Sequence, residues 1–477
     1  MSSPLSLVWF RRDLRLHDHA ALATALAGEG TVQPVFVFDT EILARFRNPA
    51  DRRLSFIMRT LVNLHRALAQ RGGGLLVLHG NPRDVLPKLA AVLKAQAIYS
   101  AEDFEPATRA RDAAVKAQYN GRFVQVVDHL LKAPYEVLKD DKTPLKVFTP
   151  YYKRWRAALH ETDYAEYVVK DRDRYADFAT VQAAARNAGL DVIDLDQPVE
   201  AALTCIGYEY FDDPIWQPAQ AEALLRDFVA EKVTDYPTQR DFMGSPGTSR
   251  LGPYLRHGLI SIRECLRAAS DAPNSATWIK ELCWREFYAM IMYHWPEVVD
   301  HEFQPHYRGT LPWTRDEAVR RVMEEATTGY PIVDAALREL TSTGWMHNRA
   351  RMIVASFFTK HLLMDWRVGE EYFAQHLMDY ELASNNGGWQ WSASTGTDAQ
   401  PYFRVFNPVL QSRKFDPVGS YIRHYLPELA ALSDKEVHWP HDSLLCPTGY
   451  PKPIVDHQAA RARAINVFKE AALKQLL

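Results

Sequence analysis

The sequence contains few cysteines and no closely spaced pair, which argues against several kinds of site. Its four cysteines lie far apart, and no CxxC motif occurs; they are Cys205, Cys265, Cys283 and Cys446. This spacing disfavours a zinc or iron–sulfur centre and a disulfide framework. We therefore expect no metal, and a reducing compartment such as the cytoplasm fits best.

Long apolar runs and a strong excess of one charge are also missing. The apolar stretch at residues 2–10 is followed at once by Arg11, Arg12 and Asp13, unlike a signal peptide. No uninterrupted apolar run reaches membrane-spanning length, so we expect no membrane association. The formal net charge of −3 is compatible with nucleic-acid binding, because a local basic groove can still hold phosphates. A monomer without an obligate protein partner is expected.

Short apolar runs alternate with helical patterns in the first 131 residues. The predicted strands are residues 5–10, 32–38, 75–79, 97–101 and 123–128, with helices at 53–70 and 84–95 between them. This alternation predicts an α/β domain built on a doubly wound parallel sheet. No GxGxxG motif follows the first strand, so the usual dinucleotide fingerprint is missing.

The remainder of the chain is predicted to be a connector followed by an all-α domain. Residues 132–205 have weak periodicity and are interpreted as a connector over the surface. Residues 206–477 form a predicted helical domain large enough to enclose a cofactor. Its expected helices are 221–232, 255–270, 275–293, 314–327, 332–343, 348–363, 369–382 and 458–476.

Residues 247–254 combine glycines, two hydroxyl residues and an arginine directly before a helical pattern. Backbone N–H groups at a helix start, the hydroxyls of Thr248 and Ser249 and the guanidinium of Arg250 together suit a phosphate or pyrophosphate. An ordinary Thr or Ser helix cap would produce the same pattern. Both interpretations stay open on these residues alone.

A second tract, residues 278–288, places Trp278, Glu281 and Trp284 or Arg285 on one helical face. A carboxylate between two indoles must be paired or lie near a polar ligand. The chain is rich in aromatic residues, with 12 Trp, 22 Tyr and 21 Phe, and most of these belong in a core. A packed tryptophan stripe is therefore the alternative interpretation.

A third tract, residues 344–352, puts Asn348 and Met352 on one helical face with Arg351 beside them. Asn donates and accepts hydrogen bonds at once, and so can read the edge of a base or ring. His347 has no His or carboxylate partner at ligand spacing. A structural role for this histidine is favoured over a metal or general-acid role.

The fourth tract, residues 385–391, reads Asn-Asn-Gly-Gly-Trp-Gln-Trp. Paired glycines in a helical region destabilise it by about 1 kcal/mol each relative to alanine. Either something approaches the backbone closely there, or the helix begins just after them. Trp389 and Trp391, two residues apart, face different neighbours. The tract suggests a pocket for a flat heterocycle, and a glycine-rich helix start among buried aromatics is the alternative.

Taken together, these tracts resemble the photolyase/cryptochrome family, and within it the bacterial cyclobutane pyrimidine dimer (CPD) photolyases. The likeness begins at residues 7–15, Leu-Val-Trp-Phe-Arg-Arg-Asp-Leu-Arg, and is densest from 329–334 through 406–408. It implies a deoxyribodipyrimidine photo-lyase, which repairs CPDs in UV-damaged DNA by electron transfer from excited reduced FAD to a lesion flipped out of the duplex.

The resemblance also implies a U-shaped FAD in the helical domain. Asp379 and Arg351 match a carboxylate–guanidinium pair beside the isoalloxazine, and Asn385 matches the residue that faces flavin N5. The residues implied to hold FAD are Tyr236, Thr248, Ser249, Arg250, Leu251, Gly252, Trp278, Glu281, Arg285, Asn348, Arg351, Asp379, Glu381 and Asn385.

The same resemblance assigns residues to catalysis and to DNA. Photolyases specific for (6-4) lesions carry His at the positions of Asn348 and Met352. The absence of these histidines favours CPD repair. The residues implied to be catalytic are Glu281, Asn385 and an electron-transfer chain of Trp389, Trp366 and Trp313. Those implied at the lesion or the DNA backbone are Glu281, Trp284, Asn348, Arg349, Met352, Trp391, Arg404 and Lys414.

An antenna chromophore is implied in the first domain, with 5,10-methenyltetrahydrofolate favoured over a deazaflavin. Residues 105–108, Glu-Pro-Ala-Thr, do not reproduce the family's folate-contact pattern. The main alternative function is a cryptochrome-like blue-light photoreceptor on the same scaffold, and the lack of a long polar tail after residue 476 disfavours it. A nicotinamide-dependent flavin oxidoreductase is a more distant alternative.

Overall fold

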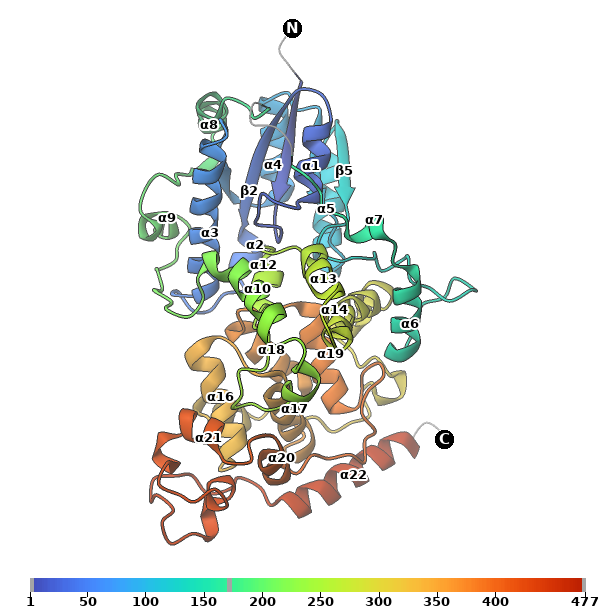
Figure 1. Cartoon of the computed structure of the whole chain (residues 1–477), viewed down its shortest axis with the longest axis vertical. Coiled ribbons are helices and arrows are strands. Elements are labelled where there is room, and N and C mark those ends of the chain that lie inside the picture. Colours follow the sequence, from blue (N-terminus) through green and yellow to red (C-terminus); the bar gives the residue numbers. More distant parts are fainter. Residues whose placement is uncertain (1–3, 170–173, 474–477) are drawn as a thin grey trace. The chain divides into compact units, whose positions relative to one another are not determined.

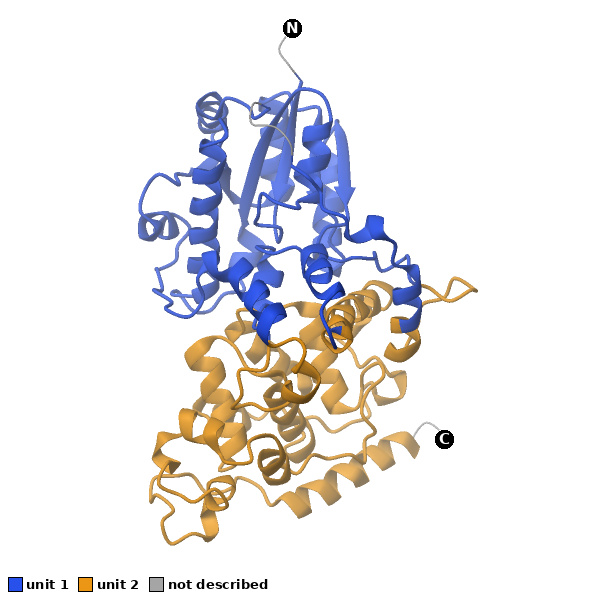
Figure 2. Ribbon diagram, in the orientation of Figure 1, with its two compact units in different colours: residues 1–137, 153–231, 249–275 blue, residues 138–152, 232–248, 276–477 orange. Residues whose placement is uncertain are grey.

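The computed structural model describes residues 4–169 and 174–473 (Figure 1). It comprises two compact units, coloured in Figure 2. Unit 1 contains the residues up to 137, 153–231 and 249–275, and unit 2 contains 138–152, 232–248 and the residues from 276 on. The units cut across the boundaries expected at residues 131 and 205.

Unit 1 is built on a six-stranded sheet in the order β5-β4-β1-β2-β3-β6. The strands are β1 Leu5–Phe10, β2 Thr31–Asp39, β3 Leu76–Gly80, β4 Ala97–Ala101, β5 Arg122–Val126 and β6 Asp191–Ile193. The first five are parallel, and β6 pairs antiparallel with β3. The predicted parallel sheet is confirmed, whereas β6 lies in the segment that was interpreted as a connector.

Both faces of this sheet are covered, as the apolar strand sequences require. Leu7, Trp9 and Leu78 face a core shared with α4, α5 and α8, while α1 packs on the strands as well. The helices of unit 1 are α1 Ala20–Ala27, α2 Thr40–Leu43, α3 Arg52–Ala69, α4 Pro82–Val92, α5 Pro106–Gln118, α7 Glu161–Tyr164, α8 Phe178–Asn187, α9 Val199–Cys205, α10 Ala221–Glu231, α12 Gly252–His257 and α13 Ile262–Ser270. Helix α6, Phe148–Ala158, contributes residues to both units.

The single helix predicted at 255–270 is wrong, because the chain forms α12 and α13 instead. Gly258 ends α12 in a left-handed conformation at φ 70°, which a glycine adopts without strain. Ser261 then caps α13 by accepting a hydrogen bond from the backbone N–H of Arg263. Apolar periodicity continued across this turn and concealed the break.

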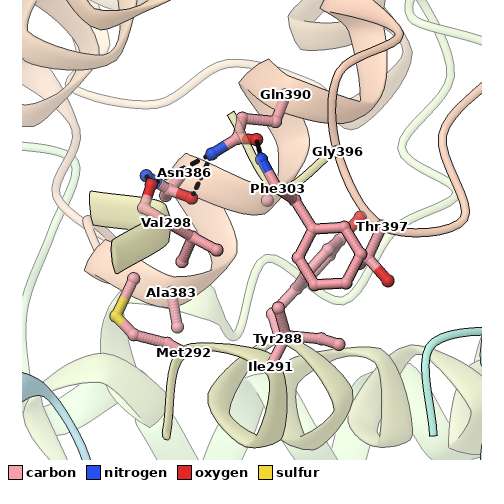
Figure 3. Close-up of a pocket in the computed structure, with 11 residues that line it drawn as sticks. Tyr288, Ile291, Met292, Val298, Phe303, Ala383, Asn386, Gln390, Gly396 and Thr397 are labelled. Carbon is pink, nitrogen blue, oxygen red and sulfur yellow. Dashed lines mark hydrogen bonds between the residues drawn. The ribbon is translucent and has the colours of Figure 1, made fainter. Parts of the chain in front are cut away.

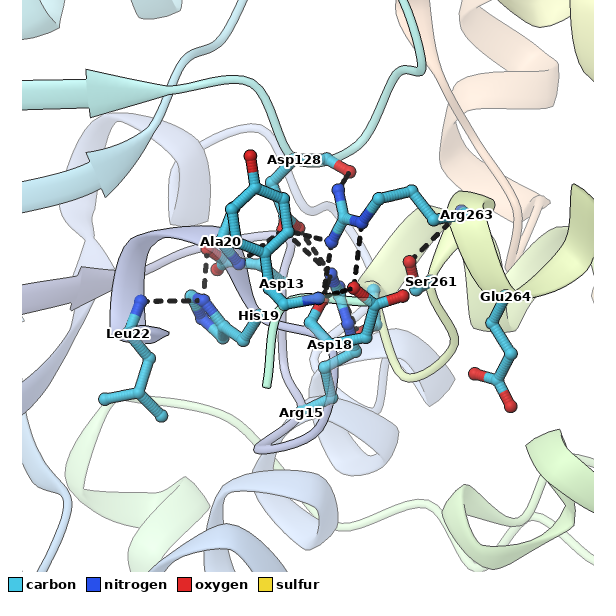
Figure 4. Close-up of polar contacts among 12 residues, drawn as sticks. Asp13, Arg15, Asp18, His19, Ala20, Leu22, Asp128, Ser261, Arg263 and Glu264 are labelled. Atoms are coloured by element: carbon cyan, nitrogen blue, oxygen red, sulfur yellow. Dashed lines mark hydrogen bonds and ion pairs between the residues drawn. The ribbon is translucent and has the colours of Figure 1, made fainter. Parts of the chain in front are cut away.

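Buried ion pairs explain why α13 belongs to the sheet unit (Figure 4). The Arg263 guanidinium donates to Asp18 Oδ1 and to Asp128 Oδ1, both at 2.9 Å. Arg15 also pairs with Asp128, at 2.7 Å, and all four side chains are almost completely buried. Burial opposes ionisation of Asp128, but the Arg15 and Arg263 charges outweigh it and hold the pKa of this carboxyl well below its usual range. The two buried carboxylates thus depend on the two guanidinium groups to compensate their negative charge.

Replacing Arg263 with methionine should therefore lower the free energy of unfolding by about 3–5 kcal/mol, because two buried carboxylates lose a partner. Urea denaturation at neutral pH measures the change. The depressed pKa of Asp128 stabilises the fold above the unfolded-state pKa, and this stability is lost as pH falls below about 4. Over that acid range, the Arg263→Met variant should lose less free energy of unfolding than the wild-type protein does. Arg267→Met, which removes a half-exposed partner of Asp18, is the matched control, and an equal effect would contradict the account.

Unit 2 is helical, and no β-strand occurs among its described residues. Its helices are α11 Tyr236–Gln239, α14 Ala276–His294, α15 Glu317–Glu325, α16 Pro331–Thr343, α17 Asn348–Ser356, α18 Trp366–His376, α19 Leu382–Ala393, α20 Pro408–Phe415, α21 Ser420–Tyr425 and α22 His457–Leu473. Helix α19 packs against α14, α17 and α18. The predicted all-α domain is confirmed. Across the described chain, no helix has the length and apolar character needed to cross a membrane.

Three of the predicted helix limits need correction or comment. The helix predicted at 348–363 is α17 followed by one π-helical turn, Phe357–His361. The helix predicted at 369–382 ends at His376, where Leu377 adopts an extended conformation before α19 begins. For the helix predicted at 458–476, residues 474–476 lie outside the described residues.

Candidate functional site

Helix α19 runs straight through the paired glycines. The prediction that a helix begins just after them is wrong, because α19 already starts at Leu382. The prediction of a close approach holds for Gly387: a Cβ atom there would lie 2.2 Å from Cδ1 of Tyr288 on α14. A Cβ on Gly388 would meet nothing within 4 Å. One glycine thus permits helix packing, and the other borders open space.

Gly387→Ala should lower the free energy of unfolding by about 1–3 kcal/mol, because the Tyr288 ring must move. Gly388→Ala is the matched control and should raise it by up to about 1 kcal/mol, since alanine favours a helix and the space is open. Thermal denaturation of the two purified variants separates the effects. A destabilised Gly388→Ala with an unaffected Gly387→Ala would reverse the assignment.

Two ion pairs hold the segment that leads into α19. Arg351 on α17 donates to both carboxylate oxygens of Asp379, at 3.0 and 2.8 Å. Arg285 on α14 donates to Glu381 at 2.8 Å. The expected Asp379–Arg351 contact is therefore present, and Glu381 has a guanidinium partner. Their contacts with FAD stay predictions.

The amide side chains of α19 have separate roles. Asn385, which is largely buried, donates from Nδ2 to the backbone oxygen and to Oε1 of Glu370 on α18, at 2.9 and 2.8 Å. Asn386 donates to the carbonyl of Val298, and Gln390 donates to the same carbonyl (Figure 3). The cavity lined by Asn386 and Gln390 has a volume of about 10 Å³. It holds at most one water molecule, so it is no ligand pocket.

The three tryptophans of the expected electron-transfer chain differ in exposure. Trp389 and Trp366 are fully buried, and Trp313 is partly exposed. Trp389 packs edge-on against Phe373, with ring centroids 5.0 Å apart. A buried start and an exposed end are what a route for electrons from solvent requires. The sequence analysis missed Glu302, whose carboxylate contacts two of the three indoles.

Glu281 on α14 is paired with Arg240, which the sequence analysis also missed. Burial raises the pKa of the Glu281 carboxyl, and Arg240 opposes the shift without cancelling it. The Arg240 guanidinium lies 5.5 Å from the ring centroid of Tyr236. Burial likewise raises the pKa of the Tyr236 hydroxyl, which keeps that group neutral. A carboxyl with an elevated pKa next to a neutral phenol suits contact with a polar, uncharged ligand.

Arg349, expected to contact DNA phosphate, already has partners in this unit. It donates to Asp241 at 2.8 Å and lies 4.2 Å from the ring centroid of Phe415. A phosphate would have to compete with the Asp241 carboxylate. Arg404 and Lys414 are exposed, as a contact with the DNA backbone requires.

The aromatic residues expected near the lesion are only partly accessible. Trp278 is buried. Trp284 is partly exposed, and Phe148 stacks on it with centroids 3.7 Å apart and ring planes within 6°. Trp391 is partly buried, on the same helix as the fully buried Trp389, which fits their predicted divergence. Phe148 lies in the predicted connector, and its role had no signal in the sequence.

Helix α17 presents the two residues that bear on lesion type. Asn348 is exposed, Met352 is half-buried, and their side chains meet at 3.9 Å between Nδ2 and Sδ. His347 caps α17, with Nδ1 accepting a hydrogen bond from the Arg349 N–H at 3.1 Å. The structural role predicted for this histidine is thus observed. Within residues 4–169 and 174–473, no cluster of three potential metal ligands occurs.

The glycine-rich tract before α12 does not form the helix cap that was one interpretation. Leu251 occupies the N-cap position, and no side chain caps the helix. The Ser249 hydroxyl instead accepts from the Leu251 N–H at 3.4 Å, and Arg250 is exposed with a positive φ of 54°. Gly252 is the first residue of α12, and Thr248 is half-buried. Phosphate binding by this tract stays a prediction.

Several features of unit 2 fit a flavin. A guanidinium–carboxylate pair precedes α19 at Asp379, and Asn385 supplies a neutral amide. A cationic Arg351 and an uncharged Asn385 together tolerate a negatively charged ring better than an aspartate would. The donor set is therefore compatible with a reduced, anionic flavin.

Comparison with known proteins agrees with this fit. Residues 6–168 match the DNA photolyase family, and residues 278–470 match the FAD binding domain of DNA photolyase. A deoxyribodipyrimidine photo-lyase from Synechococcus is 40% identical over 96% of this chain and 94% of its own. The Escherichia coli deoxyribodipyrimidine photo-lyase is 36% identical over 98% of both chains.

Solved structures extend the likeness to the whole fold. A bacterial class III photolyase from Agrobacterium tumefaciens superposes with a TM-score of 0.85 at 30% identity, covering 99% of this chain and 98% of that one. A Synechocystis cryptochrome superposes with a TM-score of 0.82 at 26% identity, covering 98% and 99%. With full-length relatives at these identities, the chain belongs to the photolyase/cryptochrome family and carries its FAD-binding domain.

Proposed function

We propose that this protein repairs cyclobutane pyrimidine dimers in DNA, using light and a bound reduced FAD. The observation that carries the proposal is the set of side chains on two helices packed against α19. Glu281 and Trp284 project from α14, and Asn348 and Met352 from α17. The set combines a carboxyl of raised pKa, an aromatic surface and neutral groups, and it contains no histidine at the two α17 positions.

Each of these groups suits an uncharged lesion that has a face for stacking and polar edges for hydrogen bonds. Trp284, supported from behind by Phe148, offers a face on which a pyrimidine can stack. Asn348 donates to and accepts from base edges, and Glu281, which is held by Arg240, can accept a hydrogen bond from an N–H of the dimer. When bound, the reduced flavin would supply an excited-state electron that opens the cyclobutane ring, and the electron would return to it once the two pyrimidines have separated.

The residues expected to hold FAD would do so with two guanidinium–carboxylate pairs and a neutral amide. Arg351 and Asp379 would orient the ring system, Asn385 would keep its neighbourhood uncharged, and Arg285 would hold Glu381 in place. Tyr236, Thr248 and residues 249–252 would bind the pyrophosphate. An antenna is proposed for unit 1, with 5,10-methenyltetrahydrofolate ahead of a deazaflavin. An absorption spectrum of the native protein would identify it, because an antenna adds near-ultraviolet absorbance beyond the flavin bands.

A blue-light photoreceptor is the second candidate, because a cryptochrome shares this fold at a TM-score of 0.82. Fold alone therefore does not separate the two functions. The neutral Asn385 and the exposed Asn348–Met352 pair favour repair.

The lesion class can be tested with two oligonucleotides, one with a CPD and one with a (6-4) photoproduct. The reduced protein under blue light should restore the first and leave the second unchanged, because α17 has no histidine to donate a proton. Chromatography of the digested strands measures both reactions. Repair of the (6-4) product alone would overturn the assignment.

A further inference from the structure

A single buried carboxylate joins two of the three tryptophans. Oε1 of Glu302 accepts hydrogen bonds from the indole Nε1 of Trp313, at 2.9 Å, and of Trp366, at 3.3 Å. The Glu302 side chain is only 3% exposed. Its other oxygen, Oε2, accepts from Arg367 at 3.1 Å. An ionised carboxylate, which only accepts hydrogen bonds, satisfies all three donors.

Trp389 has no such neighbour. Its Nε1 is buried and has no hydrogen-bond partner among the described residues. An indole that has lost an electron is a cation, and a nearby negative charge stabilises a cation most where water is excluded. The two outer tryptophans therefore stabilise a positive charge better than Trp389 does.

Arg367 limits this effect at Trp366. Its guanidinium lies 4.5 Å from the Trp366 ring centroid, and it also pairs with Asp365 at 2.9 Å. The cation next to the ring opposes oxidation of Trp366, whereas no cation–π contact to Trp313 is observed among the described residues. The sum of these charges favours the positive charge at Trp313, the partly exposed end.

The loop that carries Glu302 is fixed by the tract around the paired glycines. Gln390 accepts from the backbone N–H of Phe303 at 2.8 Å (Figure 3), and it donates to the carbonyl of His301 at 3.2 Å. Arg308 donates to the carbonyl of Glu302 at 2.8 Å. The backbone is thus held on both sides of the carboxylate, so its position is defined before any charge arrives.

We propose that Glu302 draws the electron vacancy outward from Trp389 to Trp366 and Trp313 and retains it there, an inference that rests on the proposed function. A photoexcited oxidised flavin would be the oxidant of Trp389. One electron then moves inward in each step: from Trp366 to oxidised Trp389, and from Trp313 to oxidised Trp366. The indole N–H protons stay in their hydrogen bonds to Oε1. A thiol in solution returns one electron to Trp313 and is itself oxidised.

The test is Glu302→Gln in the holoenzyme, which keeps an acceptor oxygen and removes the charge. After a light flash, the oxidised tryptophan should decay about tenfold faster by returning its charge inward, as expected for losing one charge in contact with the ring. The indole N–H resonances of Trp313 and Trp366 should also shift in the NMR spectrum, in the dark and without turnover. Glu428→Gln, which changes a partly exposed carboxylate paired with Arg338, should leave both signals unchanged.

Arg367→Gln distinguishes an effect of charge from general damage to the structure. Removing the cation that opposes oxidation of Trp366 should lengthen the lifetime of the oxidised tryptophan. Shorter lifetimes in both variants would show disruption and overturn the proposal, as would a wild-type lifetime in Glu302→Gln. Failure of the proposed function gives a different result. In that case wild-type protein would repair no dimers, while the indole shifts in Glu302→Gln would remain.

Discussion

Trp389→Phe is expected to slow light-driven reduction of the flavin by about a hundredfold, which corresponds to a barrier raised by about 3 kcal/mol. Repair by enzyme that has been reduced chemically beforehand should stay near the wild-type rate. The reason is that Trp389 is fully buried on α19 and is the inner member of the expected electron route. Absorption changes under blue light with a thiol present measure the first rate, and dimer repair under argon measures the second.

Trp439→Phe is the control for this experiment. Trp439 packs against Tyr330 in the same core and is outside the expected route, so its variant should photoreduce normally. Equal losses of photoreduction and of repair in Trp389→Phe would remove Trp389 from the electron supply and point to a structural role.

Trp284→Ala should weaken binding of DNA that contains a dimer by roughly tenfold to a hundredfold. Stacking of one base on an aromatic side chain contributes about 1–3 kcal/mol. Trp284 is well placed for this because Phe148 supports one face of its ring at 3.7 Å. Affinities measured with a labelled oligonucleotide test the prediction.

Undamaged DNA of the same sequence is the matched comparison, and its weak binding should not change. Phe148→Ala should also weaken binding of dimer-containing DNA while leaving undamaged DNA unchanged. The loss should be smaller than in Trp284→Ala, because Trp284 remains but loses its support. If Trp284→Ala weakened the binding of both DNAs equally, Trp284 would contact the DNA backbone or support folding instead of stacking on the lesion.

Much of the fold followed from local patterns. The five parallel strands are short apolar runs, and a strand buried on both faces has few alternatives. The errors arose where a local signal was weak or shared. Strand β6 has three residues, and Gly258 interrupts a periodicity that continues on both sides. Assignment of α13 to unit 1 depends on buried pairs between Arg263 and residues far away in sequence, which no periodicity reveals.

The sequence predicted many residues of the candidate site but few of the contacts between them. The Asp379–Arg351 pair and a structural role for His347 were expected and are observed, the latter as a helix cap. Arg240, Phe148 and Glu302 were missed, because each has a partner far away in sequence: Glu281 is 41 residues from Arg240, Trp366 is 64 residues from Glu302, and Phe148 stacks on Trp284. A single charged or aromatic residue outside a motif has no sequence signal until folding brings its partner near.

The central claim is tested most directly by one measurement on chemically reduced protein. An oligonucleotide with one thymine dimer is incubated with the protein in blue light and, in parallel, in the dark, and the intact strand is quantified. The account predicts conversion of the dimer to two thymines in the light and none in the dark. Flavin that is fully reduced, bound and illuminated, with no dimer converted, would contradict it and favour the photoreceptor.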